Sequence, residues 1–335
     1  MSKVIIIAEV GVNHNGCYET AKKLIDISKD CGADIVKFQS YDVNSLIVKD
    51  SDKANYQKLN TKENETSYEM LKKLSLTNKE HLKLKQYSDS IGIEYLSSAF
   101  DIKSIKFISS LNLKRLKIPS GELNNLPYLR EVAKLNLPII LSTGMCTLIE
   151  IIDAIQILEI NGISKKRITV LHCNTEYPTE FIDVNLKAMN TISKELSVDV
   201  GYSDHTKGIE VPIAAVALGA KVIEKHITLN KNSNGPDHKA STEPSEFKEM
   251  ISKIRNIELA LSGDAIKKPS RSEQKNIYFA RKSIVAITQI KKGEIFNELN
   301  IGVKRPGNGL SPMEWDNIIG RISKRSFNKD DLITI

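Results

Sequence analysis

The chain has 335 residues and a net charge of +7, from 48 Lys and Arg against 41 Asp and Glu. The basic residues are interleaved with acidic ones and form neither an arginine-rich arm nor an aromatic-studded stripe, which argues against nucleic acid and favours a small anionic substrate. No apolar run approaches the roughly 20 residues that a membrane span needs. The four cysteines show no CxxC spacing, so we expect reduced thiols in a cytoplasmic protein without a membrane partner.

Short runs rich in Val, Ile and Leu alternate along the chain with segments of helical period. The runs predict strands buried on both faces, at 4–10, 34–40, 93–98, 114–119, 138–143, 168–174, 198–203 and 221–227. The intervening patterns predict helices at 19–31, 77–91, 127–136, 147–161, 185–196, 208–219 and 245–261. Eight alternations predict an α/β fold of the (β/α)8 TIM-barrel type. A doubly wound open sheet is the alternative, but the turn at 11–16 reads GVNHNG rather than the GxGxxG usual in that fold.

The pattern changes near residue 263. Residues 266–276 are polar and predict a linker, which places a barrel domain at 1–265 and a small β-rich domain at 277–335. The last segment has β-like runs at 283–287 and 294–296. It is small, so we expect it to hold little core of its own and to dock on another surface.

Polar side chains close every predicted strand, at the edge where parallel α/β enzymes place their chemistry. Buried polar groups are costly without partners, so eight such ends in register indicate a site rather than packing. In chain order these residues are Glu9, Lys37 with Gln39, Ser98, Lys117 with Ser120, Ser142, His172 with Asn174, Ser203 with His205, and Glu224 with His226.

The types of residue at these ends suggest a reaction. Lys37 and Lys117, with several hydroxyls and an Asn, predict a cradle for phosphate and carboxylate oxygens. His205 and His226 suit a divalent metal with open positions for substrate or water, and Glu9 suits a carboxylate near that metal or a general base. Snorkelling lysines and two core histidines bonded to backbone are the alternatives. A metal that polarises a carbonyl beside a phosphorylated acid predicts carbon–carbon bond formation or cleavage.

The motifs around these residues resemble those of the bacterial sialic acid synthase family, whose members make nine-carbon nonulosonic acids. They run nearly the whole length in family order. The matching stretches are IAEVGVNHNG (7–16), VKFQ (36–39), KIPSGE (117–122), LSTGM (141–145), HCNTEYPT (172–179), GYSDHT (201–206), EKH (224–226), GPDHKAS (235–241) and KRPGNG (304–309).

This resemblance implies a TIM barrel followed by an antifreeze-like (SAF) domain, in a homodimer where each SAF domain caps the partner's barrel. It implies that phosphoenolpyruvate, an N-acylated mannosamine-type sugar and water give a nonulosonate and phosphate. It implies Mn²⁺, with Mg²⁺ or Co²⁺ as alternatives, on His205 and His226, with Glu9 nearby. By this resemblance phosphoenolpyruvate contacts Lys37, Lys117, Ser98, Ser120, Ser142, Thr175 and Ser203. The sugar contacts Gln39, Glu122, Tyr177, Asp237 and, from the other subunit, Arg305.

The sugar itself stays open at this point. N-acetylmannosamine would give N-acetylneuraminate, our first expectation, whereas 2,4-diacetamido-2,4,6-trideoxymannose would give N,N'-diacetyllegionaminate, whose branch the stretch GIEV (208–211) resembles. Ala99 and Glu180 stand where family members commonly have proline, which affects loop shape near the sugar. One rival is a Schiff-base aldolase, but it needs a lysine of lowered pKa, and we expect both lysines to be charged. The other rival is a non-catalytic carbohydrate- or ice-binding protein.

Overall fold

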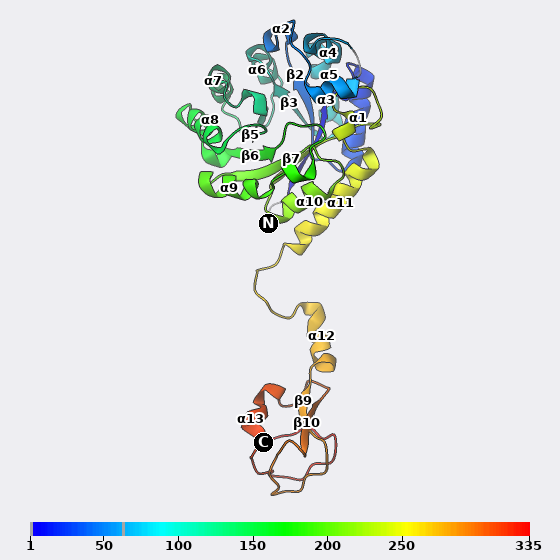
Figure 1. The fold of residues 1–335 in the computed structure, drawn as a ribbon, viewed down its shortest axis with the longest axis vertical. Coiled ribbons are helices and arrows are strands. Elements are labelled where there is room, and N and C mark those ends of the chain that lie inside the picture. The colour runs from blue at the N-terminus through cyan, green and yellow to red at the C-terminus, as the bar shows by residue number, and fades with distance from the viewer. Residues whose placement is uncertain (1–2, 62–63) are drawn as a thin grey trace. The chain divides into compact units, whose positions relative to one another are not determined.

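The computed structural model describes residues 3–61 and 64–335. The chain forms two compact units, Met1–Ser262 and Gly263–Ile335. Each unit has its own arrangement of helices and strands (Figure 1).

The first unit is a closed barrel of eight parallel strands with helices outside it (Figure 1). The barrel closes because β1 pairs with β2 on one side and with β8 on the other. This confirms the predicted TIM barrel, and each strand ends within two residues of its predicted position. The strands are β1 (Ile5–Gly11), β2 (Ile35–Ser40), β3 (Glu94–Ala99), β4 (Leu116–Ile118), β5 (Ile139–Ser142), β6 (Ile168–Cys173), β7 (Asp199–Asp204) and β8 (Val222–His226).

All seven predicted helices are present, as α1 (Tyr18–Cys31), α5 (Asn78–Ile91), α7 (Leu126–Lys134), α8 (Leu148–Ile160), α9 (Lys187–Leu196), α10 (Glu210–Ala217) and α11 (Pro244–Ala260). Capping boxes start α5 at Thr77 with Glu80, α8 at Thr147 with Glu150 and α11 at Glu243 with Glu246. Four short helices were not predicted, because they span too few turns to show a helical period. They are α2 (Val43–Leu46), α3 (Asn55–Thr61), α4 (Ser67–Leu74) and α6 (Ile102–Ser109).

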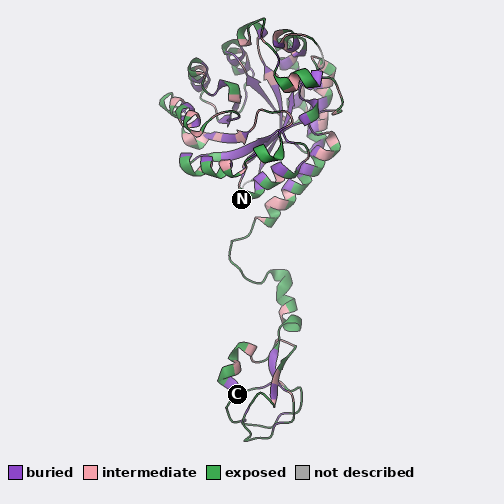
Figure 2. Cartoon of the chain, viewed as in Figure 1, coloured by how far each residue is buried: buried purple, intermediate pink, exposed green. Residues whose placement is uncertain are grey.

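The core of this unit lies between the barrel strands and the surrounding helices. All residues of β5 and β8 are buried, as expected for strands covered on both faces. Figure 2 shows the same division, with buried strands at the centre and helices that are buried on one side and exposed on the other. This packing holds the carboxyl ends of the strands in one rigid ring.

One buried histidine in this core predicts a pH dependence of stability. His81 on α5 contacts the Tyr95 hydroxyl through Nδ1 (2.7 Å), and burial lowers the pKa of His81 to about 4. The unfolded chain therefore binds more protons below about pH 6.5, so folding stability is lost as the pH falls from there toward 4. We expect the contribution of His81 to lower the free energy of unfolding by about 2 kcal/mol on going from pH 7 to pH 5.

Urea unfolding of the wild type and of His81→Phe at both pH values measures this cost. The variant should lose about 2 kcal/mol less than the wild type on going from pH 7 to pH 5. The histidines other than His14 titrate in both proteins and cancel in the comparison, whereas replacing His81 also removes its influence on the pKa of His14. Equal losses in the two proteins would contradict the assignment.

The second unit has a core of its own, which is small, as expected from its length. It contains α12 (Arg271–Ala280), α13 (Trp315–Ile318) and the antiparallel pair of β9 (Ser283–Ala286) and β10 (Ile301–Lys304). The predicted linker is helical from Arg271, because Ser270 and Glu273 form a capping box. The buried core side chains are Ile284, Ala286, Ile290, Phe296, Ile301, Ile318, Phe327 and Ile333.

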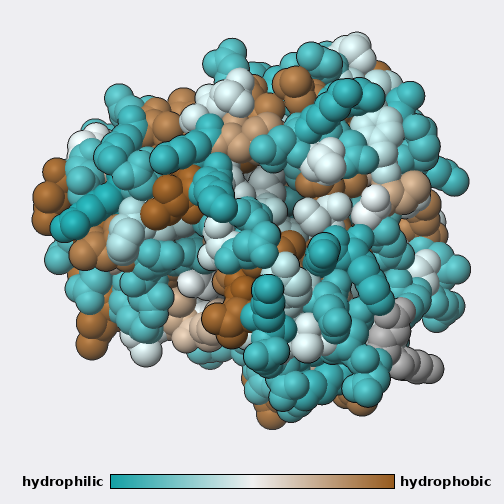
Figure 3. All heavy atoms as spheres, turned by 90° about the horizontal axis from the view of Figure 1, so that it is seen from above, coloured by the Kyte–Doolittle hydropathy of each residue, from teal (hydrophilic) through white to brown (hydrophobic). Residues whose placement is uncertain are grey.

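The surface mixes hydrophilic and hydrophobic side chains. On the face drawn in Figure 3, hydrophobic residues form small groups separated by hydrophilic ones. Among the described residues, no helix is both long and apolar enough to cross a membrane.

Candidate active site

A cavity of about 290 Å³ lies at the carboxyl ends of the barrel strands. Every strand of the barrel contributes at least one polar or ionisable side chain to it, and on every strand except β6 this is a residue that the strand-end pattern predicted. From β1 to β8 these side chains are Glu9, Lys37 with Gln39, Ser98, Lys117, Ser142, Cys173, Ser203, and Glu224 with His226. Loop residues Ser120, Thr175, Tyr177 and His205 complete the predicted part of the lining.

Two buried lysines and two buried carboxylates form the charged floor of this cavity. Lys37 Nζ lies 2.8 Å from Glu9 Oε2 and 3.7 Å from Glu224 Oε1. Lys117 Nζ lies 3.8 Å from the same Glu224 oxygen. Glu224 therefore links the two lysines. The sequence placed Glu224 among the polar strand ends but predicted no role for it.

Serine hydroxyls hold these charges in place. Lys37 Nζ donates to Ser98 Oγ (3.1 Å) and Lys117 Nζ to Ser142 Oγ (2.6 Å). Ser203 donates to Glu224 (3.0 Å). The ammonium groups and hydroxyls face one space, which is the arrangement that oxygen atoms of a phosphate or carboxylate require.

The two lysines differ electrostatically. Burial opposes the charge on Lys37, but Glu224 and Glu9 outweigh it and hold the pKa of Lys37 above its ordinary value. Burial lowers the pKa of Lys117, although the nearby Glu224 carboxylate opposes that shift. Burial raises the pKa of Glu9 to about 7, with Lys37 opposing the shift and Glu224 adding to it. Glu9 is thus able to take up or release a proton near neutral pH.

A bulge in β1 shapes the site around Glu9. The pairing of β1 with β2 shifts between Glu9 and Gly11, and Gly11 has a φ of +53°. A Cβ there would lie 3.2 Å from the His226 ring and 3.3 Å from Glu9 Oε1. Glycine suits this position because the left-handed backbone conformation strains other residues and a Cβ would crowd the neighbouring side chains.

His205 and His226 lie side by side, with ring centroids 5.4 Å apart. His205 Nδ1 donates to the Asn174 carbonyl (2.5 Å), which leaves its Nε2 unprotonated. His226 Nδ1 has no hydrogen-bond partner among the described residues, and Asp237 Oδ2 lies 3.8 Å from it. Burial lowers the pKa of His205 to about 4 and that of His226 well below its ordinary value.

These features suit a divalent metal ion. Metal-ligating imidazoles must be neutral and oriented by a bond from the other ring nitrogen, and His205 meets both conditions. The unpaired nitrogen of buried His226 is a polar atom in need of a partner. In the part of the chain that the structure describes, no group of three or more His, Cys, Asp or Glu converges on a metal position. An ion held here would therefore keep open positions for water or substrate.

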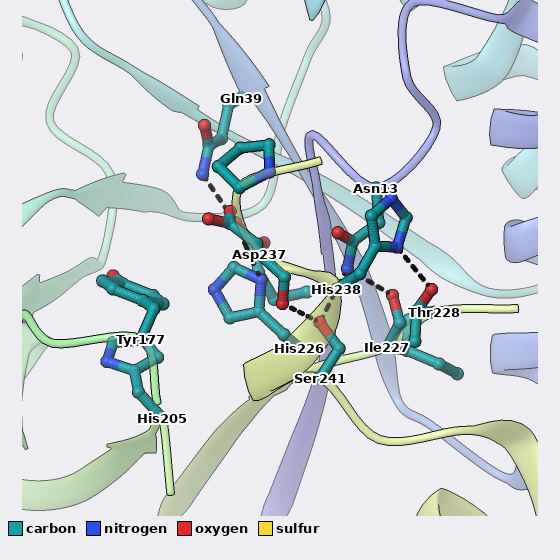
Figure 4. Close-up of polar contacts among 12 residues, drawn as sticks. Asn13, Gln39, Tyr177, His205, His226, Ile227, Thr228, Asp237, His238 and Ser241 are labelled. Carbon is teal, nitrogen blue, oxygen red and sulfur yellow. Dashed lines mark hydrogen bonds and ion pairs between the residues drawn. The ribbon is translucent and has the colours of Figure 1, made fainter. Parts of the chain in front are cut away.

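Aromatic rings line the cavity beside the histidines. The Tyr177 ring packs at a tilt against His205 (4.1 Å between centroids) and against Tyr56 (5.0 Å between centroids). Figure 4 shows Tyr177 against His205, and Asp237 beside His226. Tyr56 comes from α3, and Phe100 and Met145 also line the cavity. Sequence reasoning missed Tyr56 because no periodic pattern marks the connection between β2 and α5.

Four predicted site residues do not line this cavity. Asp237 is buried near His226, and burial raises its pKa to about 7. Glu122 accepts a hydrogen bond from Asn125 (2.6 Å). Asn174 donates to the Asp183 carbonyl (2.9 Å) and lines an adjoining cavity of about 590 Å³. Arg305 is exposed on the second unit, directly after β10.

The strand-end pattern was also wrong for His172. Its side chain lines the adjoining cavity and its Nε2 contacts the Val184 carbonyl (2.8 Å). On β6 it is Cys173 that faces the charged floor, because successive side chains of a strand point to opposite faces. The larger adjoining cavity lacks the lysine–carboxylate cluster, so we place the chemistry in the smaller one.

The model of the NeuB family matches residues 24–267 and that of the SAF domain matches residues 281–335. The chain belongs to the NeuB family. An N,N'-diacetyllegionaminic acid synthase of Campylobacter jejuni is 52% identical over 99% of each chain. One of Legionella pneumophila is 47% identical over 96% of this chain and 90% of its own.

A solved structure shares the family fold. It is an N-acetylneuraminic acid synthetase of Leptospira borgpetersenii in complex with citrate, with a TM-score of 0.72 at 33% identity over 82% of this chain and 90% of that one. The family resemblance inferred from the motifs is thereby confirmed. As a NeuB-family enzyme, the protein is a transferase that uses phosphoenolpyruvate to form a carbon–carbon bond.

Proposed function

We propose that this enzyme condenses phosphoenolpyruvate with 2,4-diacetamido-2,4,6-trideoxymannose and water to give N,N'-diacetyllegionaminate and phosphate. The observation that carries the sugar assignment is the 52% identity over 99% of both chains with a synthase named for that product. The first expectation, N-acetylneuraminate from N-acetylmannosamine, becomes the second candidate. It is supported by the solved synthetase at 33% identity.

In this proposal the charged floor binds phosphoenolpyruvate. Lys37 and Lys117 pair with its phosphate and carboxylate, and Ser98, Ser142 and Ser203 have hydroxyls within reach of the same space. Ser120 and Thr175 add further hydroxyls at the rim. Glu224 keeps the ammonium groups aimed at the cavity when the substrate is absent.

The sugar then lies between this floor and the aromatic wall of Tyr177. Carbon 3 of phosphoenolpyruvate bonds to the aldehyde carbon of the open-chain sugar, water adds to carbon 2, and phosphate leaves with its bridging oxygen. Glu9 handles one proton, either on the added water or on the sugar's ring-opening hydroxyl, which suits its pKa of about 7. Gln39 donates to Glu9 (3.2 Å) and so orients that carboxylate.

We propose that His205 and His226 hold a divalent ion, Mn²⁺ in the first place, with Mg²⁺ or Co²⁺ as alternatives. When bound, such an ion polarises the aldehyde and makes its carbon electrophilic. The supporting observations are the neutral histidines and the unpaired His226 nitrogen.

We further propose a cytoplasmic homodimer in which the C-terminal unit of each chain caps the partner's barrel. Glu122, Asp237 and Arg305 would then contact the sugar at the cavity mouth, with Arg305 coming from the partner. This is supported by the exposure of Arg305 and by the cavity lining, which contains no arginine among the described residues.

The sugar assignment is tested by competition. Equal concentrations of N-acetylmannosamine and 2,4-diacetamido-2,4,6-trideoxymannose are incubated with phosphoenolpyruvate and Mn²⁺, and the products are separated by mass spectrometry. We expect N,N'-diacetyllegionaminate to exceed N-acetylneuraminate at least tenfold, roughly, because unmatched polar groups in a fitted site cost rate steeply. A predominance of N-acetylneuraminate would restore the first expectation.

Because burial lowers the pKa of Lys117, the same assay needs a control for a Schiff-base mechanism at this lysine. A Schiff-base aldolase would be inactivated by borohydride in the presence of pyruvate. The proposed reaction forms no imine, so its rate should be unchanged by this treatment.

A further inference from the structure

A buried ion pair stands directly behind the two histidines. Asp204 on β7 and Lys225 on β8 are both 0% exposed, and their Cα positions are paired in the sheet register. Ser203 and Glu224, their chain neighbours, line the cavity. Because side chains alternate along a strand, Asp204 and Lys225 point the opposite way, into the layer between barrel and helices.

Hydrogen bonds connect this pair to Thr206, so the network involves both chain neighbours of His205. Lys225 Nζ donates to Asp204 Oδ2 (2.5 Å) and to the Thr206 carbonyl (2.9 Å). Asp204 Oδ1 accepts from the Thr206 amide (3.1 Å) and hydroxyl (2.8 Å). The backbone from residue 204 to residue 206 is thus tied to residue 225, the residue before His226.

Packing alone does not account for charges at this place. The other side chains that β7 and β8 send into the same layer include Tyr202 and Ile223, both buried. Burying two charges carries a desolvation penalty, and apolar residues of similar size often serve stability as well or better. Neither side chain lines the cavity, so neither acts on substrate there.

The network does restrict how the two strands are aligned. A slip of one residue between β7 and β8 would separate the charges and turn one histidine away from the cavity. A rotation of the backbone at Thr206 would break its three bonds to the pair. Either change removes a buried charge from its partner, which is strongly unfavourable, whereas an apolar pair would tolerate it.

We propose that Asp204 and Lys225 are positioning residues that orient the imidazole rings of His205 and His226 toward a shared metal ion. The inference rests on the proposed metal site. It assigns the buried pair to metal affinity rather than to overall stability.

The test replaces the pair with apolar residues and measures metal binding without substrate. Asp204→Leu combined with Lys225→Met removes both charges, so neither is left unpaired. We expect a folded protein, judged by circular dichroism, whose affinity for Mn²⁺ in an electron paramagnetic resonance titration falls at least about tenfold. The visible spectrum of bound Co²⁺ should change as well, because the ligand geometry differs.

A matched control removes a buried polar pair between two other strands of the barrel. Ser40 on β2 and Ser97 on β3 share a buried hydrogen bond (2.7 Å) and neither lines the cavity. Ser40→Ala with Ser97→Ala should leave Mn²⁺ affinity unchanged. An equal loss in this control would mean general loosening of the barrel and would overturn the inference.

The remaining outcomes are also decisive. Wild-type protein that binds no Mn²⁺ would overturn the metal site and this inference together. Wild-type binding with undiminished affinity in the folded Leu/Met variant would overturn only the inference. If that variant does not fold, Thr206→Val decides: it removes one hydrogen bond to Asp204 and should weaken Mn²⁺ binding about threefold, and unchanged affinity would overturn the proposal.

Discussion

If His205 and His226 hold the proposed metal ion, replacing His226 with alanine is expected to abolish metal binding and to lower kcat by at least roughly a thousandfold. His226 is buried at the end of β8, its ring lies 5.4 Å from that of His205, and its Nδ1 lacks a hydrogen-bond partner among the described residues. Chelation of the wild type should have the same effect, and Mn²⁺ should restore the wild type but not the variant. Metal content after dialysis and steady-state rates measure both effects.

His172 provides the matched control for this experiment. It also lies near the end of a barrel strand, but its ring faces the adjoining cavity and contacts the Val184 carbonyl. His172→Ala should therefore retain its metal and most of its activity. Full activity of exhaustively chelated wild-type enzyme would show that the histidines serve another purpose.

Mixing two impaired variants is expected to restore activity. If Arg305 serves the partner's active site, a dimer of one Arg305→Ala chain and one His226→Ala chain has one site with both lesions and one site with neither. Random association of equal amounts should then recover about a quarter of wild-type activity, since half of the dimers are mixed and one site in each is intact. Each variant alone should be strongly impaired, Arg305→Ala through weakened sugar binding.

The subunits are mixed under conditions of exchange, and activity is followed at saturating phosphoenolpyruvate and limiting sugar. Native mass spectrometry of the mixture, with a size-altering tag on one of the two variants, shows whether exchange takes place. Exchange without rescue would place Arg305 in the active site of its own chain and exclude the proposed swap of C-terminal units.

The sequence by itself was sufficient for the barrel and for most of its charged floor. Strands buried on both faces appear as continuous runs of Val, Ile and Leu, and the barrel then brings every strand's carboxyl end to one edge. Lys37, Lys117 and His226 were predicted in this way and line one cavity. The same reasoning failed for His172, because a pattern of polar ends does not tell which of two neighbouring residues faces inward. Cys173 occupies that place on β6 instead.

Only the tertiary structure decided which charges meet. Glu224 sits between Lys37 and Lys117, although 107 residues or more separate it from either lysine in the chain. Tyr56 reaches the cavity from α3, where no periodicity marks it. The pairing of Asp204 with Lys225 depends on the register between β7 and β8. Local sequence patterns report which face of an element is buried, whereas contacts between elements depend on register and packing, which the chain acquires only when the barrel closes.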